Sequence, residues 1–254
     1  MIRQYFIKIM TNSLQLSQLP GFIRKNIDPD TYKRELFVRL CANETKKNGI
    51  VLDAGAGECQ YKKYFTNHKY IGTDLAIGQD SWNYNNLDVI SNLEKLPFKN
   101  CTFDSILCLQ VLEHVKEPQN VCNELYRVLK VNGNLYLSIP QGWCVHHQAP
   151  NDYYRFTNYG IKYILEKSKF TIDFIKPTTG YFGYLANRLI FFPKIVFWKI
   201  KNKTIRCLLL PLELISYFIF VILLPLILNI CDRFDADKDF TLNYLIKAHK
   251  NVNQ

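Results

Sequence analysis

The sequence predicts an α/β fold with a doubly wound, mostly parallel sheet. Short apolar segments of strand length alternate with longer segments of helical spacing, the order expected of strands joined by crossover helices. The segment 50–54 runs into the turn Asp53-Ala54-Gly55-Ala56-Gly57, and the next strand segment, 69–73, is followed directly by Asp74. In an open α/β sheet the carboxyl ends of neighbouring strands face one crevice, where ligands bind.

The composition fits a globular chain of one large domain, or of a domain with an appendage. The 254 residues are 48% hydrophobic and 21% charged, with a formal net charge of +10. Such a charge raises nucleic acid or a membrane surface as a partner. The eight cysteines are scattered without the paired spacing of a zinc site, so we expect no metal and a reducing compartment.

Residues 1–49 are predicted to form a helical N-terminal segment that is broken at Pro20-Gly21. Apolar residues at positions 32, 36, 37 and 40 recur at helical spacing. Polar residues interrupt the first part of the segment, so it lacks the unbroken apolar stretch of a signal peptide. We therefore expect the protein to face the cytoplasm.

Residues 50–180 are predicted to form the sheet domain, and residues 236–254 its last strand and tail. A helix is expected to begin at Pro118, continue to Leu129 and end at Asn132-Gly133. A second helix is expected at 159–169. The expected strands are 50–54, 69–73, 103–109, 135–140, 170–175 and 240–248.

Residues 181–235 are predicted to form a basic and hydrophobic helical insertion before the last strand. Seven lysines and arginines and no acid lie between Phe174 and Leu212. Glu213 is the only charged residue from Cys207 to Cys231. Two prolines, at 211 and 225, are expected to interrupt any long straight helix there.

Two nucleoside cofactors compete for the crevice at the ends of the first two strands. Glycines let the backbone approach a ligand, and an acid after the second strand can accept both hydroxyls of a ribose. A dinucleotide fingerprint requires a third glycine, but Glu58, Cys59 and Gln60 follow Gly57. A pyrophosphate would lie poorly between Asp53 and Glu58, whereas these acids attract the cationic groups of S-adenosylmethionine. A turn that binds no ligand is the remaining alternative.

Several segments in the expected order resemble the motifs of class I S-adenosylmethionine-dependent methyltransferases, of the type 11 kind. They are the glycine turn 53–57, Ser91-Asn92-Leu93-Glu94-Lys95-Leu96-Pro97-Phe98, Phe103-Asp104-Ser105-Ile106 with Val111-Leu112-Glu113-His114-Val115, and Arg127-Val128-Leu129-Lys130. The resemblance covers about residues 50–175 and implies a Rossmann-like sheet of seven strands. It also implies that S-adenosylmethionine is the cofactor.

The resemblance assigns the methionine and ribose ends of the cofactor to the first two strands. Asp53, Gly55 and Gly57 would surround the methionine part. Asp74 would accept the ribose hydroxyls, and Leu75 would lie against the adenine.

Three further positions match the family with small departures. Asn92, with Leu93 beside it, stands where the family usually has an Asp that accepts from the adenine amino group, and an amide oxygen can accept the same bond. Gln110 would border the sulfonium. The family's P-G-G turn appears as Val131-Asn132-Gly133, in which Asn tolerates the left-handed conformation.

The acceptor side of the site is predicted in the segment 146–157. It resembles the H-x-x-P-x-D-Y-Y-R-x-T segment of a subset of these methyltransferases, often encoded with cell-surface glycan or natural-product pathways, with His147 in the histidine position. A hydroxyl acceptor must lose a proton, which a histidine or a carboxylate near the methyl can accept. The candidate catalytic residues are His147 as the base, Asp152, Tyr154 and His114.

Structural roles compete with these catalytic ones. The alternatives are a loop cap for His147, an ion pair between Asp152 and Arg155, a helix N-cap for Thr157, a loop-ordering role for His114, and core positions for Tyr153 and Tyr154.

The uncharged stretch from Leu214 to Cys231 approaches the length of about 20 residues that crosses a bilayer. A single crossing conflicts with topology, because the strands before and after the insertion belong to one sheet. A crossing hairpin would bury Lys194 and Lys199 at about 2.5–3.5 kcal/mol each. We therefore expect peripheral or re-entrant contact of residues 188–231 with a membrane. A cap over the substrate site, an oligomer interface and a single-span anchor are the alternatives.

The predicted function is methyl transfer from S-adenosylmethionine to a small-molecule, lipid or lipid-linked glycan acceptor in envelope or secondary metabolism, by O-methylation. The rivals are a protein or RNA methyltransferase of the same fold and a non-catalytic scaffold or binding protein that keeps the fold. Nucleic acid is not favoured, because the basic residues alternate with Phe, Trp and Leu beside an apolar stretch. The expected location is the cytoplasm, at the inner face of a membrane.

Overall fold

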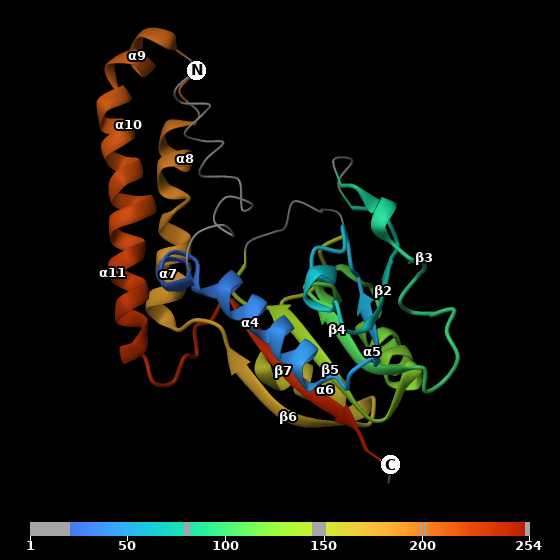
Figure 1. Ribbon diagram of the computed structural model, residues 1–254. Helices are drawn as coiled ribbons and strands as arrows, with labels where there is room; N and C mark the ends of the chain where they lie inside the picture. The colour runs from blue at the N-terminus through green and yellow to red at the C-terminus, as the bar shows by residue number, and fades with distance from the viewer. Residues whose placement is uncertain (1–20, 79–81, 144–150, 199, 201, 252–254) are drawn as a thin grey trace. The chain divides into compact units, whose positions relative to one another are not determined.

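The computed structural model describes residues 21–78, 82–143, 151–198, 200 and 202–251. The chain divides into two compact units. Unit 1 comprises residues 1–33 and 179–241, and unit 2 comprises residues 34–178 and 242–254. Unit 2 contains the sheet, and unit 1 contains the helices of the insertion (Figure 1).

Unit 2 is built on a seven-stranded sheet in the order β3-β2-β1-β4-β5-β7-β6. The strands from β1 to β5 pair in parallel, and β7 is antiparallel to both β5 and β6. The predicted doubly wound, mostly parallel sheet of seven strands is confirmed. Its topological switch point lies between β1 and β4, where α/β sheets of this kind bind ligands. The strands are β1 (Ile50–Ala54), β2 (Lys69–Asp74), β3 (Val89–Ile90), β4 (Phe103–Leu109), β5 (Leu129–Pro140), β6 (Phe170–Pro177) and β7 (Asn243–Lys250).

Apolar side chains cover both faces of this sheet. On one face, α5 (Pro118–Val128) and α6 (Asn158–Lys167) contribute Val121 and Leu165 to a core that also contains Leu52. On the other face, Phe37 of α4 (Pro29–Glu44) belongs to a second core with Val51. Successive residues of β1 therefore face opposite cores, which explains why this strand is a continuous apolar run.

β5 begins earlier than expected. Helix α5 ends at Val128 and β5 begins at Leu129, so Asn132-Gly133 lies inside the strand and not at a helix end. Leu129 pairs with Phe103 and Asn134 with Ser105, and the residues between them form a bulge. Asn132 has φ of 61°, which confirms the left-handed conformation expected for it.

The glycine turn after β1 does not open an α-helix. Cys59 has φ of 58°, which a right-handed helix cannot accommodate. The chain continues through turns into a short 3-10 helix at Lys62–Tyr64.

Unit 1 contains the predicted apolar helix before the last strand. α10, the π-helical segment Phe218–Leu223 and α11 form one helical run from Leu210 to Phe234, which lies beside α7 and α8 (Figure 1). The described helices of unit 1 are α3 (Gly21–Ile27), α7 (Tyr181–Leu189), α8 (Phe192–Phe197), α9 (Lys203–Leu208), α10 (Leu210–Tyr217), α11 (Leu224–Cys231) and a 3-10 turn at Asp232–Phe234.

The two prolines of this run do not interrupt it, contrary to expectation. Pro211 lies in the first turn of α10, where a backbone N–H would have no helical partner. Pro225 is the second residue of α11, in the turn after the π-helical segment, whose wider turn accommodates the proline ring.

Candidate functional site

Backbone hydrogen bonds join the ends of β1, β2 and β3 at one edge of the sheet in unit 2. The Gly55 N–H donates to the Thr73 carbonyl at 2.8 Å, and the Ala56 N–H donates to the same oxygen at 3.0 Å. The Ser91 N–H donates to the Asp74 carbonyl at 3.0 Å. The glycine turn, the second acid and the segment before Asn92 therefore form one connected edge.

Both glycines of the turn adopt left-handed backbone conformations. Gly55 has φ of 81° and Gly57 has φ of 52°. A Cβ on Gly55 would lie 2.3 Å from Cγ2 of Val111, so a side chain there would clash as well as strain the backbone. The turn needs glycine at this position.

Asp74 is half-buried at the end of β2, and the backbone fixes its orientation. Oδ2 accepts from the Gly57 N–H at 3.0 Å, and Oδ1 accepts from the Ala76 N–H at 2.9 Å. A carboxylate oxygen accepts about two hydrogen bonds, so each oxygen keeps room for one more donor. This geometry fits a pair of neighbouring hydroxyls.

Asp53 lies behind the turn and not on its surface. Its side chain is buried, and Oδ2 accepts from the Tyr70 hydroxyl at 2.5 Å. Burial raises the pKa of Asp53 to about 7, the bond from Tyr70 opposes this rise, and the charge of Asp74 adds to it. Tyr70 was not predicted as part of the site, although the alternation of β2 places its side chain on the buried face of the sheet that also carries Asp53.

The residues expected beside the adenine and the sulfonium are held in different ways. Leu75 exposes 45% of its surface, whereas Leu93 is buried in the core. The Asn92 side-chain oxygen accepts from the Glu94 N–H at 2.9 Å, so a turn already uses one of its acceptor positions. Gln110 has φ of 59°, and its amide donates to the Ser138 hydroxyl at 2.9 Å.

An aromatic segment over the glycine turn was not predicted. A Cβ on Gly57 would lie 3.5 Å from the ring of Trp82. The Tyr84 hydroxyl accepts from the Gly78 N–H at 2.7 Å, and Glu58 accepts from the Asn83 N–H at 2.9 Å. The signal that could have found this segment is the Trp-x-Tyr pair soon after the second acid.

On the acceptor side, His114 contacts the loop after β5. Its Nδ1 lies 2.6 Å from the Asn151 carbonyl oxygen and 4.0 Å from Oδ1 of Asp152. Asp152 forms two hydrogen bonds with Arg155, at 2.7 and 2.8 Å, and its side chain is almost fully buried. The ion-pair alternative for Asp152 and the loop-ordering alternative for His114 therefore match the geometry.

The rest of this loop also follows the structural alternatives in part. The Thr157 hydroxyl accepts from the Gly160 N–H at 3.0 Å and caps α6. Tyr154 stacks on Phe156, donates to the Lys116 carbonyl at 2.8 Å, and remains partly exposed. His147 lies in 144–150, outside the described residues.

Glu113 lies in a motif segment named above, but it was not predicted to be part of the site. Its side chain is buried, and burial raises its pKa to about 8 despite the opposing charges of Arg155 and Arg34. Its Oε1 lies 3.8 Å from Nε2 of His114. Near neutral pH this carboxyl is therefore largely protonated. Within the described ranges, no three His, Cys, Asp or Glu side chains gather as metal ligands.

Comparison with known proteins finds similarity for the central part of this chain. Residues 52–137 match the family described as the methyltransferase domain. An uncharacterized protein of Methanocaldococcus jannaschii is 28% identical over 136 residues, which are 52% of this chain and 60% of the relative. The chain therefore covers less than two thirds of that relative's length.

Solved structures of low sequence identity share the fold. Phosphoethanolamine N-methyltransferase 2 of Haemonchus contortus, in complex with S-adenosyl-L-methionine, gives a TM-score of 0.52 at 17% identity, over 86% of this chain and 52% of that one. The 1,6-didemethyltoxoflavin-N1-methyltransferase of Burkholderia thailandensis gives a TM-score of 0.50 at 15% identity, over 98% of this chain and 90% of that one. A [4+2]-cyclase gives a TM-score of 0.52 at 16% identity, over 86% of this chain and 81% of that one. Likeness at this level shows a common fold and does not fix the reaction.

Proposed function

We propose that the chain is a class I S-adenosylmethionine-dependent methyltransferase and that it transfers a methyl group to a small-molecule, lipid or lipid-linked glycan acceptor by O-methylation; the family match over residues 52–137 supports this proposal. The observation that best supports the proposal is the anchored carboxylate of Asp74, which keeps two free acceptor positions beside a left-handed glycine turn.

The residues of this edge fit S-adenosylmethionine better than a dinucleotide. The turn carries Glu58 and is followed by turns and not by the N-terminus of an α-helix, so it offers no site for a pyrophosphate. Asp74 would accept the ribose hydroxyls, and Gly55 and Gly57 would leave space for the methionine part. Leu75 would cover the adenine, with Asn92 and Leu93 beside it and Gln110 near the sulfonium.

Asp53 would act on the cofactor indirectly. Its carboxyl is bonded to Tyr70 inside the core, so its proposed role is to hold the turn in shape from behind. The sequence had placed Asp53 around the methionine part, acting directly or through water.

S-adenosylmethionine supplies a methyl group on a sulfonium, whose leaving group is neutral. The main task of the protein is then to align the acceptor with this methyl group. For a hydroxyl acceptor a side chain must also take up a proton. We propose His147 for this role, with His114 as the second candidate; Asp152 and Tyr154 would shape the loop around the acceptor.

Two of the structural neighbours support an acceptor of small size, because their names specify phosphoethanolamine and 1,6-didemethyltoxoflavin. Both are N-methyltransferases, so O-methylation rests on the histidine and carboxylate groups of this chain. The cyclase of the same fold indicates that this fold is not confined to methyl transfer, so the fold alone does not distinguish the enzyme from the scaffold alternative.

We also propose that residues 188–231 contact a membrane and that the enzyme works at the cytoplasmic face, as a core with an insertion at 181–235. The helix Leu210–Phe234 is long and apolar enough to cross a membrane by length and composition, and its most apolar 18-residue window has a mean hydropathy of 2.6. The seven basic residues before it suit anionic headgroups. A lipid or lipid-linked acceptor would be reached at such a surface.

An activity assay with methyl-labelled cofactor tests the proposed function. The protein is incubated with lipid and polar extracts of the source organism, and labelled products are separated. Transfer by the wild type and its loss in Asp74→Ala support methyl transfer, and chromatography of the product identifies the acceptor class. Cofactor binding without transfer to any fraction favours the scaffold. Absence of both binding and transfer rejects the proposal.

A further inference from the structure

The helix Leu210–Phe234 exposes apolar side chains and buries polar ones. Glu213 and Ser216 are 3% and 7% exposed, and only 11% of the most apolar part of the helix is buried. A helix on the surface of a water-soluble domain shows the opposite pattern. One exposed stripe recurs at spacings of three and four residues: Leu212, Ile215, Phe218, Ile222, Leu226 and Ile230.

The other side of this helix is already occupied within unit 1. The rings of Phe192 and Phe220 lie 4.3 Å apart and join α8 to the π-helical segment. The Asn229 amide donates to the Asn26 carbonyl at 2.7 Å and joins α11 to α3. The apolar stripe is therefore the side of the helix that has no cover from the described part of unit 1.

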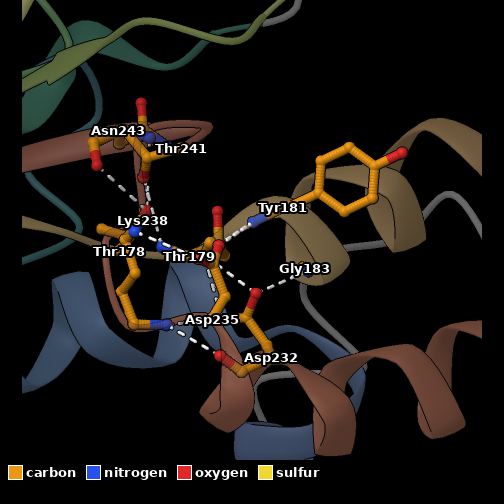
Figure 2. Close-up of polar contacts among 10 residues, drawn as sticks. Thr178, Thr179, Tyr181, Gly183, Asp232, Asp235, Lys238, Thr241 and Asn243 are labelled. Carbon is orange, nitrogen blue, oxygen red and sulfur yellow. Dashed lines mark hydrogen bonds and ion pairs between the residues drawn. The ribbon is translucent and has the colours of Figure 1, made fainter.

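The two ends of the helical insertion are held together by a buried carboxylate (Figure 2). Asp232 accepts from the Gly180 N–H at 2.9 Å and the Gly183 N–H at 2.8 Å, and it pairs with Lys238 at 3.1 Å. Asp235 accepts from the Tyr181 N–H at 2.6 Å. The acids at the end of the apolar helix, Asp232 in its last turn and Asp235 just after it, thus cap the first turn of α7.

This closure limits how the insertion can meet a bilayer. In unit 1 the Thr179 N–H donates to the Thr241 hydroxyl oxygen at 3.2 Å. In unit 2 the Thr178 N–H donates to the Asn243 carbonyl oxygen at 2.9 Å. The chain therefore leaves and returns at one place, so it crosses a bilayer an even number of times or not at all. Within 179–241, apart from positions 199 and 201, Leu210–Phe234 is the only helix with the length and hydropathy of a span.

The charge around the stripe selects an anionic lipid surface over a second copy of the chain. Lys194 and Trp198 are exposed on and just after α8, with the ammonium 5.8 Å from the indole ring, a pair of types common where membrane and water meet. In a symmetric dimer the same patch faces itself, which would bring two strongly basic stretches together. Anionic headgroups neutralise them instead.

We propose that the helix Leu210–Phe234 lies in the plane of an anionic membrane, with its exposed stripe at the boundary between headgroups and acyl chains. This inference rests on the membrane contact proposed above and specifies its partner and its depth. Helices of this length are found in such interfacial positions, where the apolar face reaches about 5–10 Å into the lipid.

A tryptophan at position 218 measures this depth. Phe218→Trp is made in a chain whose own tryptophans (82, 143 and 198) are changed to Phe, and it is mixed with vesicles of phosphatidylcholine with or without phosphatidylglycerol. Some lipids carry bromine near the headgroup end of the acyl chain, others near its terminal methyl. We expect binding to the anionic vesicles and stronger quenching by the shallow bromines, by about twofold for a ring at this depth.

Wild-type protein gives a second measurement that needs no substitution. Cys207 in α9 and Cys101 in unit 2 are both exposed. An impermeant maleimide added outside anionic vesicles should label Cys101 at its rate in solution and Cys207 several times more slowly. Equal protection factors for the two cysteines contradict the proposal.

Three other results overturn it in distinguishable ways. Strongest quenching by the deep bromines shows a helix that spans the bilayer. No binding to anionic vesicles together with a dimer in sedimentation shows that a second copy covers the stripe. A protein that binds S-adenosylmethionine and methylates a soluble acceptor but binds no vesicle keeps its proposed reaction and loses its membrane partner.

Discussion

Gly55 combines a left-handed backbone with a crowded neighbourhood. We expect Gly55→Ala to lower the free energy of unfolding by about 2–4 kcal/mol, because the new methyl group adds backbone strain and clashes with Val111. Chemical denaturation measures the change. The matched control is Gly160→Ala in α6, where φ is not left-handed and the methyl group meets only the Thr157 hydroxyl, at 3.3 Å. The control should change stability by less than about 1 kcal/mol. Similar losses in both variants would speak against a special requirement at Gly55.

The buried carboxyl of Glu113 gives stability a pH dependence with a definite sign. Its pKa is about 8 in the folded chain, compared with an ordinary value of 4.5. The folded state therefore holds a proton that the unfolded state releases. This contribution to stability is fully present below about pH 4.5 and is lost as the pH rises through about 8.

Glu113→Gln should remove this dependence. The slope of unfolding free energy with pH should become less negative by up to about 1.4 kcal/mol per pH unit between pH 5 and 8. Urea denaturation at several pH values provides the slopes. Asp53, whose pKa is about 7, contributes equally to both proteins and cancels in the comparison. Glu166→Gln, at an exposed position of α6, is the control. Parallel slopes for wild type and Glu113→Gln would rule out a raised pKa at this position.

Individual side chains were predicted well where the backbone pattern determines them. The strand-end position of Asp74 and the left-handed conformation of Asn132 follow from local sequence. The burial of Asp53 against Tyr70 does not follow from local sequence, because it depends on which face of β1 meets α4. The pairing of Asp152 with Arg155 does not follow from it either, since the sequence allowed a structural or a catalytic role for Asp152.

At the level of secondary structure, the acids after the apolar helix stabilise the start of α7. Asp232→Ala would leave the Gly180 and Gly183 N–H groups without their carboxylate, and Lys238 would keep only its bond to the backbone carbonyl at position 232. We expect a loss of about 2–4 kcal/mol in local stability. Hydrogen exchange should accelerate at the amides of 180–184 and far less in β4. Asp239→Ala, an exposed acid nearby, should leave exchange unchanged. Unchanged exchange in Asp232→Ala would contradict the cap.

The elements that sequence predicted best are those with long or strongly patterned signals. The bounds of β1 and β4 are as predicted, because most of their side chains are apolar and nearly all of them are buried. β3 was missed because a strand of two residues carries no periodicity. The start of β5 was misplaced because Asn132-Gly133, a turn signal, forms a bulge inside a strand. Pro225 was read as a helix break, although a π-helical turn absorbs it.

For the whole molecule, the likeness to a methyltransferase domain was predicted because several weak motifs occur in the correct order, and the family model matches residues 52–137 of this region. The acceptor could not be predicted in the same way. The residues proposed to bind it lie in a loop whose groups can serve either structure or chemistry, and His147 lies outside the described residues. The proposed membrane contact depends on an exposed apolar surface, whose presence the sequence composition indicates but whose orientation it cannot give.

Calorimetric titration with S-adenosylmethionine tests the central claim most directly. We expect the wild type to bind and Asp74→Ala to bind about 10–100-fold more weakly, because charge-assisted hydrogen bonds to the ribose contribute about 1.5–3 kcal/mol. Asp239→Ala, which removes an exposed acid of the same charge, should bind as the wild type does. Failure of the wild type to bind, or equal affinity of Asp74→Ala, would contradict the account.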